Sequence, residues 1–183
     1  MRNLMELCQH DYSEYDCADV DEHGLFGYKY LDHYWMEAGR HAFLVRVAGK
    51  LAGFVLVRRV DSGDKPAIHT IAELFVMRKY RRQGIGRQVA WQMLDLFPGQ
   101  WSIAQEEGNR PAQSFWRRVI DGSRKGRIRT KNCRQKNGMG HGRDFKVGRT
   151  TRRHLESHFH KWIGTERSVL QGSGQAYLGE ALP

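Results

Sequence analysis

The feature that most constrains the fold is an apolar segment that changes within a few residues into a basic loop with two glycines. The segment Ile68–Met77 is mostly apolar, as expected of a β-strand that is buried on both faces. The basic loop Arg78–Arg87 follows, and a helix is predicted from about Gly86 to Phe97, because apolar residues recur on one stripe. A loop of this kind directs unpaired backbone N–H groups and the positive end of the helix dipole at one point. Such a point binds an anion, and a pyrophosphate fits it.

The loop residues suit this role. Gly84 and Gly86 permit positive φ and close approach of the backbone, and the neighbouring arginines add positive charge. The spacing is neither G-x-G-x-x-G nor G-x-x-x-x-G-K-[ST], so a dinucleotide fold or a nucleotide triphosphatase is not indicated. A plainer interpretation is an ordinary strand-to-helix connection with a solvated basic face.

The remaining elements of the first 120 residues are short. Two β-rich runs, residues 41–47 and 51–57, flank a glycine-containing turn and predict an antiparallel hairpin, and residues 61–66 predict a loop. Apolar residues at helical spacing predict a helix within residues 28–37, with Gly39 as its stop.

Two elements are predicted after the first long helix. Trp101–Gln105 predicts another strand. Asn109 predicts the N-cap of a helix, with Pro111 in the first turn and an apolar face made by Ala112, Phe115, Trp116 and Val119.

These segments together resemble a known family. Arg81-Arg82-Gln83-Gly84-Ile85-Gly86 resembles the R/Q-x-x-G-x-G/A motif of the GNAT N-acetyltransferases, which binds the pyrophosphate of acetyl-CoA in that family. Asn109-x-x-Ala112-x-x-Phe115-Trp116 resembles the later N-x-x-A-x-x-F-Y/W segment of the same family. With the hairpin, the resemblance covers about residues 41–120.

The resemblance implies an α/β (α+β) fold of the GNAT type, in which a mixed, mostly antiparallel sheet is flanked by helices. It also implies acetyl transfer from acetyl-CoA to a primary amine by direct attack, with the co-substrate bound where strands 68–77 and 101–105 part. The backbone of β-strand residues and the loop amides hold acetyl-CoA in this family. The matching positions are Phe75, Val76, Met77, Arg81, Arg82, Gln83, Gly84, Ile85, Gly86, Arg87, Asn109 and Trp116.

Two catalytic groups are predicted. Glu73 is the carboxylate within strand 68–77, and a desolvated carboxylate there can accept a proton, directly or through water. Alternatively, Glu73 pairs with a nearby arginine or lies at the sheet edge. The resemblance assigns the oxyanion donor to a backbone N–H near Phe75.

The match departs from the family at Trp116, where the family often has a tyrosine that protonates the leaving thiolate. Tryptophan has no proton of suitable acidity, so water or another residue supplies it, or Trp116 simply forms a wall of the pocket. Tyr80 offers a hydroxyl, although a solvent-facing loop tyrosine is the plainer interpretation. The departure also allows a non-catalytic acyl-CoA-binding or regulatory module.

Other polar clusters have two interpretations each. His41 and His69 are either bases or structural histidines. His154, His158 and His160 include an i, i+4 pair that could hold a metal on a helix, but no metal site is predicted. The acidic residues near the N-terminus form an entrance for a cationic amine or a solvated face: they are Asp11, Glu14, Asp16, Asp19, Asp21 and Glu22.

The net charge of +10 lies in one part of the chain. Residues 1–120 contain 16 basic and 15 acidic residues, whereas residues 121–163 contain 13 basic and 3 acidic residues. We therefore predict a boundary near residue 121, between a GNAT-like domain at 1–120 and an atypical basic segment at 121–183. After the boundary, no convincing alternating apolar run precedes the short Phe159–Ile163.

The basic segment has two explanations. It is a tail for nucleic-acid or other phosphates, which makes a nucleic-acid-associated protein an alternative function. Or the reading frame changes near residue 121 and the following residues are foreign to the family. Three widely spaced cysteines, no long apolar run and no secretory signal predict a cytoplasmic protein without a membrane segment, and a homodimer is possible.

Overall fold

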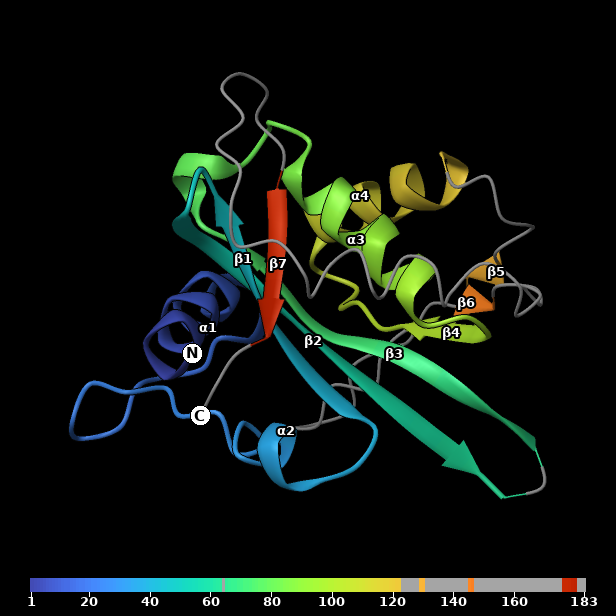
Figure 1. Ribbon diagram of the computed structural model, residues 1–183. Coiled ribbons are helices and arrows are strands. Elements are labelled where there is room, and N and C mark those ends of the chain that lie inside the picture. Colours follow the sequence, from blue (N-terminus) through green and yellow to red (C-terminus); the bar gives the residue numbers. More distant parts are fainter. Residues whose placement is uncertain (64, 123–128, 131–144, 147–175, 181–183) are drawn as a thin grey trace.

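The computed structural model describes residues 1–63, 65–122, 129–130, 145–146 and 176–180. Their main feature is a five-stranded sheet with the order β4-β3-β2-β1-β7. The helices lie on both faces of this sheet, with α1 and α2 on one side and α3 and α4 on the other (Figure 1). The elements are α1 (Arg2–Asp16), α2 (His33–Met36), β1 (Arg40–Val47), β2 (Lys50–Ser62), β3 (Lys65–Val76), η1 (Arg78–Tyr80), α3 (Ile85–Leu96), β4 (Gln100–Ile103), α4 (Arg110–Asp121), β5 (Arg129–Thr130), β6 (Phe145–Lys146) and β7 (Ala176–Glu180).

The sheet is mostly antiparallel, which confirms the predicted fold class. β1 pairs with β2, β2 with β3 and β1 with β7 in antiparallel fashion, and β3 pairs with β4 in parallel. The predicted hairpin is present as β1 and β2. Its turn residues Ala48 and Gly49 have φ values of 49° and 76°, the two positive values that a tight two-residue hairpin turn requires.

The predicted loop at residues 61–66 is wrong in its extent. β2 continues to Ser62, and Ser62 pairs with Lys65 at the start of β3. Gly63, at φ 61°, lets the chain reverse direction tightly, so pairing persists to the tip.

The helices agree with the predictions at α3 and α4 and differ in the first forty residues. Asn109 caps α4, and its side chain accepts a hydrogen bond from the Ala112 N–H at 2.9 Å. The helix predicted within residues 28–37 is the single turn α2. The long helix α1 was not predicted, because its buried stripe is short and includes Met5 and the half-buried Leu4 and Cys8.

Two apolar clusters hold these layers together. One lies between the sheet and the helices α3 and α4 and includes Val57, Val89 and Trp101. The other lies between the sheet and α1 and α2 and includes Met5, Tyr34 and Phe54. Val57, Val89 and Phe54 have no exposed surface, so their burial is a main source of stability.

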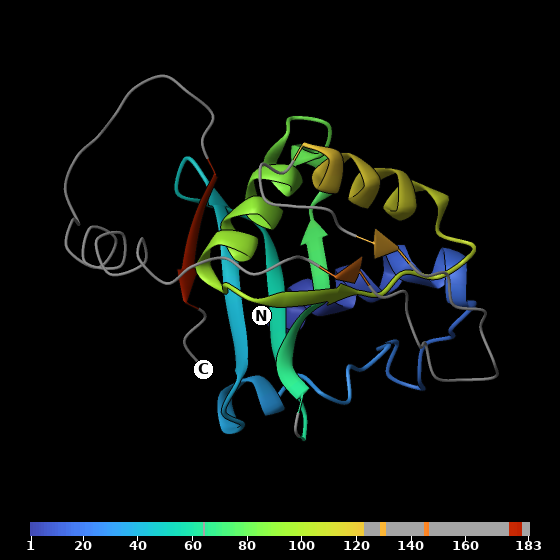
Figure 2. The same ribbon diagram turned by 90° about the vertical axis from the view of Figure 1, so that its right-hand side faces the viewer.

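The C-terminal part contributes one strand to the described sheet. β7 lies beside β1 in both views, at the sheet edge opposite β4 (Figures 1 and 2). β7 is not among the elements predicted from the sequence. Most of the basic segment 121–163, the run Phe159–Ile163 and the residues that would test a change of reading frame lie outside the described residues.

No helix within the described ranges is long and apolar enough to cross a membrane.

Candidate functional site

A pocket lies where two neighbouring strands separate. β3 and β4 are paired from Ile68 opposite Gln100 to Ile71 opposite Ile103, and the pairing ends there. Beyond this point a pocket of about 780 Å³ is lined by α1, the end of β3, residues 103–107 and α4. This is the position at which the resemblance to the GNAT family places the co-substrate.

A β-bulge at the mouth of the pocket changes the direction of one side chain. Glu73 pairs with Leu56 and Ile71 with Val57, so Ala72 is the extra residue. Side chains alternate between the faces of a strand, so without the bulge Glu73 would point with Ile71 into the core under α3 and α4. With it, Glu73 lies on the α1 side and receives a hydrogen bond from the Tyr28 hydroxyl.

The environment of Glu73 favours a proton acceptor that works near neutral pH. Burial raises the pKa of Glu73 to about 7, and the hydrogen bond from Tyr28 opposes part of this rise. Among the described residues, no arginine forms an ion pair with Glu73. The alternative of a simple structural ion pair therefore finds no support in the described structure.

The glycine loop presents backbone N–H groups at the start of α3. Gly84 is the N-cap residue at φ 80°, and a Cβ atom added to it would meet no atom within 4 Å. The first bond within the helix runs from the Gln88 N–H to the Gly84 carbonyl (3.0 Å), so the preceding amides have no partner inside the helix. The loop also contains Arg82 at φ 63°, a conformation that non-glycine residues adopt rarely.

Gly86 has a packing role as well. A Cβ atom at this position would lie 3.3 Å from the ring of Phe115 on α4. The second glycine of the motif therefore lets α3 and α4 approach each other closely.

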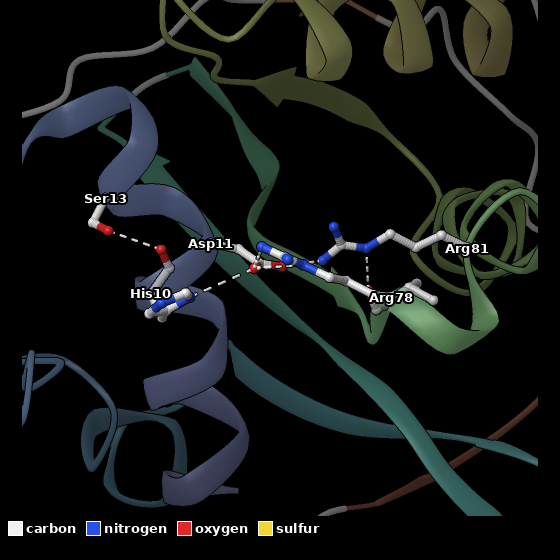
Figure 3. A network of polar contacts seen from close by, with 6 residues as sticks. His10, Asp11, Ser13, Arg78 and Arg81 are labelled. Atoms are coloured by element: carbon white, nitrogen blue, oxygen red, sulfur yellow. Dashed lines mark hydrogen bonds and ion pairs between the residues drawn. The ribbon is translucent and has the colours of Figure 1, made fainter.

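An acidic residue of α1 binds the arginines at the start of this loop (Figure 3). Asp11 accepts hydrogen bonds from Arg78, at 2.7 Å and 3.2 Å, and from Arg81. Arg81 also donates from Nε to the Val76 carbonyl at 2.6 Å. Burial raises the pKa of Asp11, but the hydrogen bonds from Arg81 and Arg78 outweigh this effect and hold that pKa below its usual range.

The pocket brings together some of the predicted site residues and not others. The predicted residues that line it are Glu73, Phe75, Arg81, Asn109 and Trp116. The predicted residues outside the lining are Val76, Met77, Arg82, Gln83, Gly84, Ile85, Gly86 and Arg87, which belong to the end of β3, the loop and the first turn of α3.

Three of these side chains have structural contacts of their own. The Asn109 side chain is the cap of α4, and Trp116 is 6% exposed and packs edge-on against Phe115. Ile85 is buried in the core at 2% exposure, so only its backbone can face a ligand.

The histidines lie elsewhere. The rings of His41 and His69 contact Phe97, with centroids 4.8 Å and 5.5 Å apart, and neither histidine lines the pocket. Tyr80 is half-buried against the core and does not line the pocket either. Within the described residues no His, Cys, Asp and Glu side chains gather as a metal site, and His154, His158 and His160 lie outside them.

The wall formed by α1 is acidic and aromatic. Of the six acidic residues predicted as an entrance, three line the pocket and three do not: Asp11, Glu14 and Asp16 do, and Asp19, Asp21 and Glu22 do not. Glu106 and Glu107, from the segment after β4, add two carboxylates to the lining.

Sequence reasoning missed several pocket residues. Tyr12 and Tyr28 line the pocket, and the Tyr12 hydroxyl bonds to Glu106 across it. Gln105 also lines it; this side chain is 7% exposed, and its Nε2 has no hydrogen-bond partner among the described residues. No local pattern marks these residues, because α1 and the segment after it reach the strands only through packing.

Comparison with known proteins gives a match to one family. A family model described as "Acetyltransferase (GNAT) family" matches residues 2–120. Comparison with curated protein sequences gives no match.

Solved structures with a similar chain include three acetyltransferases. A GNAT-family acetyltransferase from Streptococcus pneumoniae has 11% identity and a TM-score of 0.44, over 81% of this chain and 94% of its own. Arabidopsis thaliana NAA60, in complex with a bisubstrate analogue, has 16% identity and a TM-score of 0.44. The match covers 80% of this chain and 91% of the NAA60 chain. An acetyltransferase from Vibrio fischeri has 16% identity and a TM-score of 0.41. The match covers 55% of this chain and 82% of the Vibrio fischeri chain.

Proposed function

The chain belongs to the GNAT family of acetyltransferases, and we propose that it transfers an acetyl group from acetyl-CoA to a primary amine by direct attack. The observation that carries this proposal is the position of Glu73. It is a partly buried carboxylate at a β-bulge, it lines the pocket between the parted strands, and its pKa is raised to about 7. A general base is most effective when its pKa lies near the working pH.

Features of the described residues fit acetyl-CoA. The unpaired amides of Gln83 to Arg87 and the free space at Gly84 suit its pyrophosphate. The buried, unpartnered Nε2 of Gln105 suits an acceptor atom such as an amide carbonyl of the pantetheine arm. We retain Phe75, Val76 and Met77 as backbone contacts of that arm.

The backbone of β3 offers candidate oxyanion donors. The N–H groups of a strand point alternately to its two sides, and the Met77 N–H donates to the Ala52 carbonyl on β2 at 2.8 Å. By this alternation the N–H groups of Leu74 and Val76 point away from β2, toward the side where β4 has separated. By the same alternation the Phe75 N–H points toward β2. We therefore propose the N–H groups of Leu74 and Val76, in place of the predicted Phe75 N–H, as candidates for stabilising the oxyanion.

In the proposed reaction, the neutral amine attacks the thioester carbonyl, and Glu73 accepts, directly or through water, the proton that the nitrogen loses as the N–C bond forms. An N–H group of β3 stabilises the negative charge that develops on the carbonyl oxygen. The C–S bond then breaks, the thiolate takes a proton from water because Trp116 has no acidic proton to give, and Glu73 returns its proton to the solvent. The acidic residues Glu14, Asp16, Glu106 and Glu107 favour a cationic molecule as the carrier of the amine.

Thermal unfolding with and without acetyl-CoA tests the binding step. A ligand that binds the folded state raises the midpoint, and we expect this rise in the wild type and its loss in Gly84→Glu, which combines a negative charge with a strained φ. Release of free thiol with a panel of amines then tests transfer. Binding without thiol release would support a non-catalytic acyl-CoA-binding module, and no rise in a cooperatively unfolding wild type would contradict the proposal.

A further inference from the structure

Asp11 is a single carboxylate that holds two guanidinium groups from the start of the glycine loop (Figure 3). Its Oδ1 accepts from Arg78 and its Oδ2 accepts from Arg81, so both oxygens are used. The Asp11 side chain is 20% exposed, which places this contact at the partly buried junction of α1 with the loop. The three side chains carry a net charge of +1.

The contact orients Arg81 without using up its donors. A guanidinium has five N–H groups, and Arg81 uses one for the Val76 carbonyl and one for Asp11. The planar group is therefore fixed at two points, and three donors remain for another acceptor. Arg81 is also 40% exposed, so these donors can reach a ligand.

The same contact connects three parts of the site. Val76 is the last residue of β3, Arg81 is the first residue of the R-x-x-G-x-G motif, and Asp11 belongs to the helix that forms the acidic wall of the pocket. Holding the loop in its binding conformation before the ligand arrives lowers the cost of binding. Arg82, at φ 63°, shows that this conformation has to be held against a local preference.

We propose that Asp11 is a positioning residue for acetyl-CoA: it holds Arg81 and Arg78 so that the loop from Arg81 to Arg87 is formed in advance. This inference rests on the proposed function, because the loop is taken as the pyrophosphate site. Asp11 acts through the arginines and does not touch the reacting atoms.

Calorimetric titration of the full chain with acetyl-CoA tests this role. In Asp11→Asn we expect the Kd and the KM for acetyl-CoA to rise about fivefold to tenfold, with kcat within about twofold of wild type. Asp11→Glu, which keeps the charge, should recover part of the loss. Asp32→Asn is the matched control, because it breaks an exposed Arg2–Asp32 pair (2.6 Å) away from the pocket.

A double-mutant cycle separates positioning from a general structural role. If Asp11 acts through Arg81, Asp11→Asn should change the Kd little in an Arg81→Met background. An equal loss in both backgrounds, or a loss no greater than in Asp32→Asn, would overturn the inference.

Hydrogen exchange of the amides of residues 82–88 in the ligand-free chain gives a readout that does not need acetyl-CoA. We expect faster exchange in Asp11→Asn than in Asp32→Asn. If the wild type does not bind acetyl-CoA but this difference is present, the proposed function fails while the role of Asp11 in shaping the loop stands. Unchanged exchange would overturn that role even if the wild type binds.

Discussion

At the scale of single residues, the site depends on a carboxylate whose environment opposes its charge. Glu73 is partly buried, its pKa is raised to about 7, and Tyr28 is the hydrogen-bond partner that limits the rise. A structural acid usually gains an ion pair, and this one has none among the described residues. Such an arrangement is typical of a functional group.

Replacement of Glu73 tests its role as the base. Glu73→Gln keeps the shape of the side chain and removes the proton acceptor, so kcat/KM for the amine should fall by about a hundredfold or more. The Kd for acetyl-CoA should change little, because none of the proposed contacts with acetyl-CoA uses the Glu73 side chain. Steady-state kinetics and calorimetry measure the two effects, and a kcat/KM within about threefold of wild type would contradict the role.

Replacement of Tyr28 tests how the pKa of this base is set. The Tyr28 hydrogen bond lowers the pKa of Glu73, so its loss in Tyr28→Phe should raise that pKa further above its ordinary value. The base is active above its pKa, and the acidic limb of the pH profile of kcat/KM should therefore move to higher pH. Profiles with an amine of low pKa, measured from about pH 5.5 to 9, would show this movement. A shift to lower pH would refute the assignment.

At the scale of elements, the close approach of β2 fixes the position of β3, the strand that carries Glu73. Gly53 on β2 lies opposite Val76, and a Cβ atom added to Gly53 would be 2.0 Å from the Phe75 carbonyl oxygen. That oxygen is backbone and cannot rotate away. The absence of a side chain at Gly53 thus fixes the end of the strand from which the site is built.

Gly53→Ala should therefore destabilise the protein by at least about 2 kcal/mol, because the two strands must move apart or the backbone must distort. Denaturant unfolding measures the loss. Gly108→Ala is the matched control, since its added Cβ meets no atom within 4 Å. Equal stability of the two variants would mean that β2 and β3 are less closely held than the structure shows.

At the scale of the whole molecule, the raised pKa of the Glu73 carboxylate makes stability depend on pH. The pKa of Glu73 rises from 4.5 to about 7 on folding, so the folded state binds its proton more tightly than the unfolded state. The contribution of this group to stability is full below about pH 4.5 and is lost as the pH rises through about 7.

Glu73→Gln should then be more stable than wild type at pH 8, by a free energy of unfolding on the order of 3 kcal/mol at most. At about pH 4.5 the difference should nearly vanish, because the wild-type group is neutral in the folded state and only about half ionised in the unfolded state. Thermal or denaturant unfolding at the two pH values checks this. A stability difference that does not grow with pH would show that the charge of Glu73 is better accommodated than its burial implies.

The sequence by itself determined the order of elements from residue 40 to residue 121 and the loop at the start of α3. Those elements are encoded locally: the apolar run of β3, the glycines at 84 and 86, and the Asn109 cap act over a few residues. The hairpin turn at Ala48 and Gly49 is local too. The family match covers residues 2–120 and therefore includes nearly all of this part of the chain.

Only the tertiary structure decided how the pocket is completed. α1 contributes Asp11 and Tyr12, the segment after it contributes Tyr28, and the pairing of β7 with β1 joins residues far apart in the sequence. The bulge that turns Glu73 toward α1 is also invisible in the sequence, because it depends on the register between β2 and β3. Contacts of this kind depend on how segments far apart in the sequence pack together. The periodicity of side chains predicts which face of an element is buried, but not which other segment packs against that face.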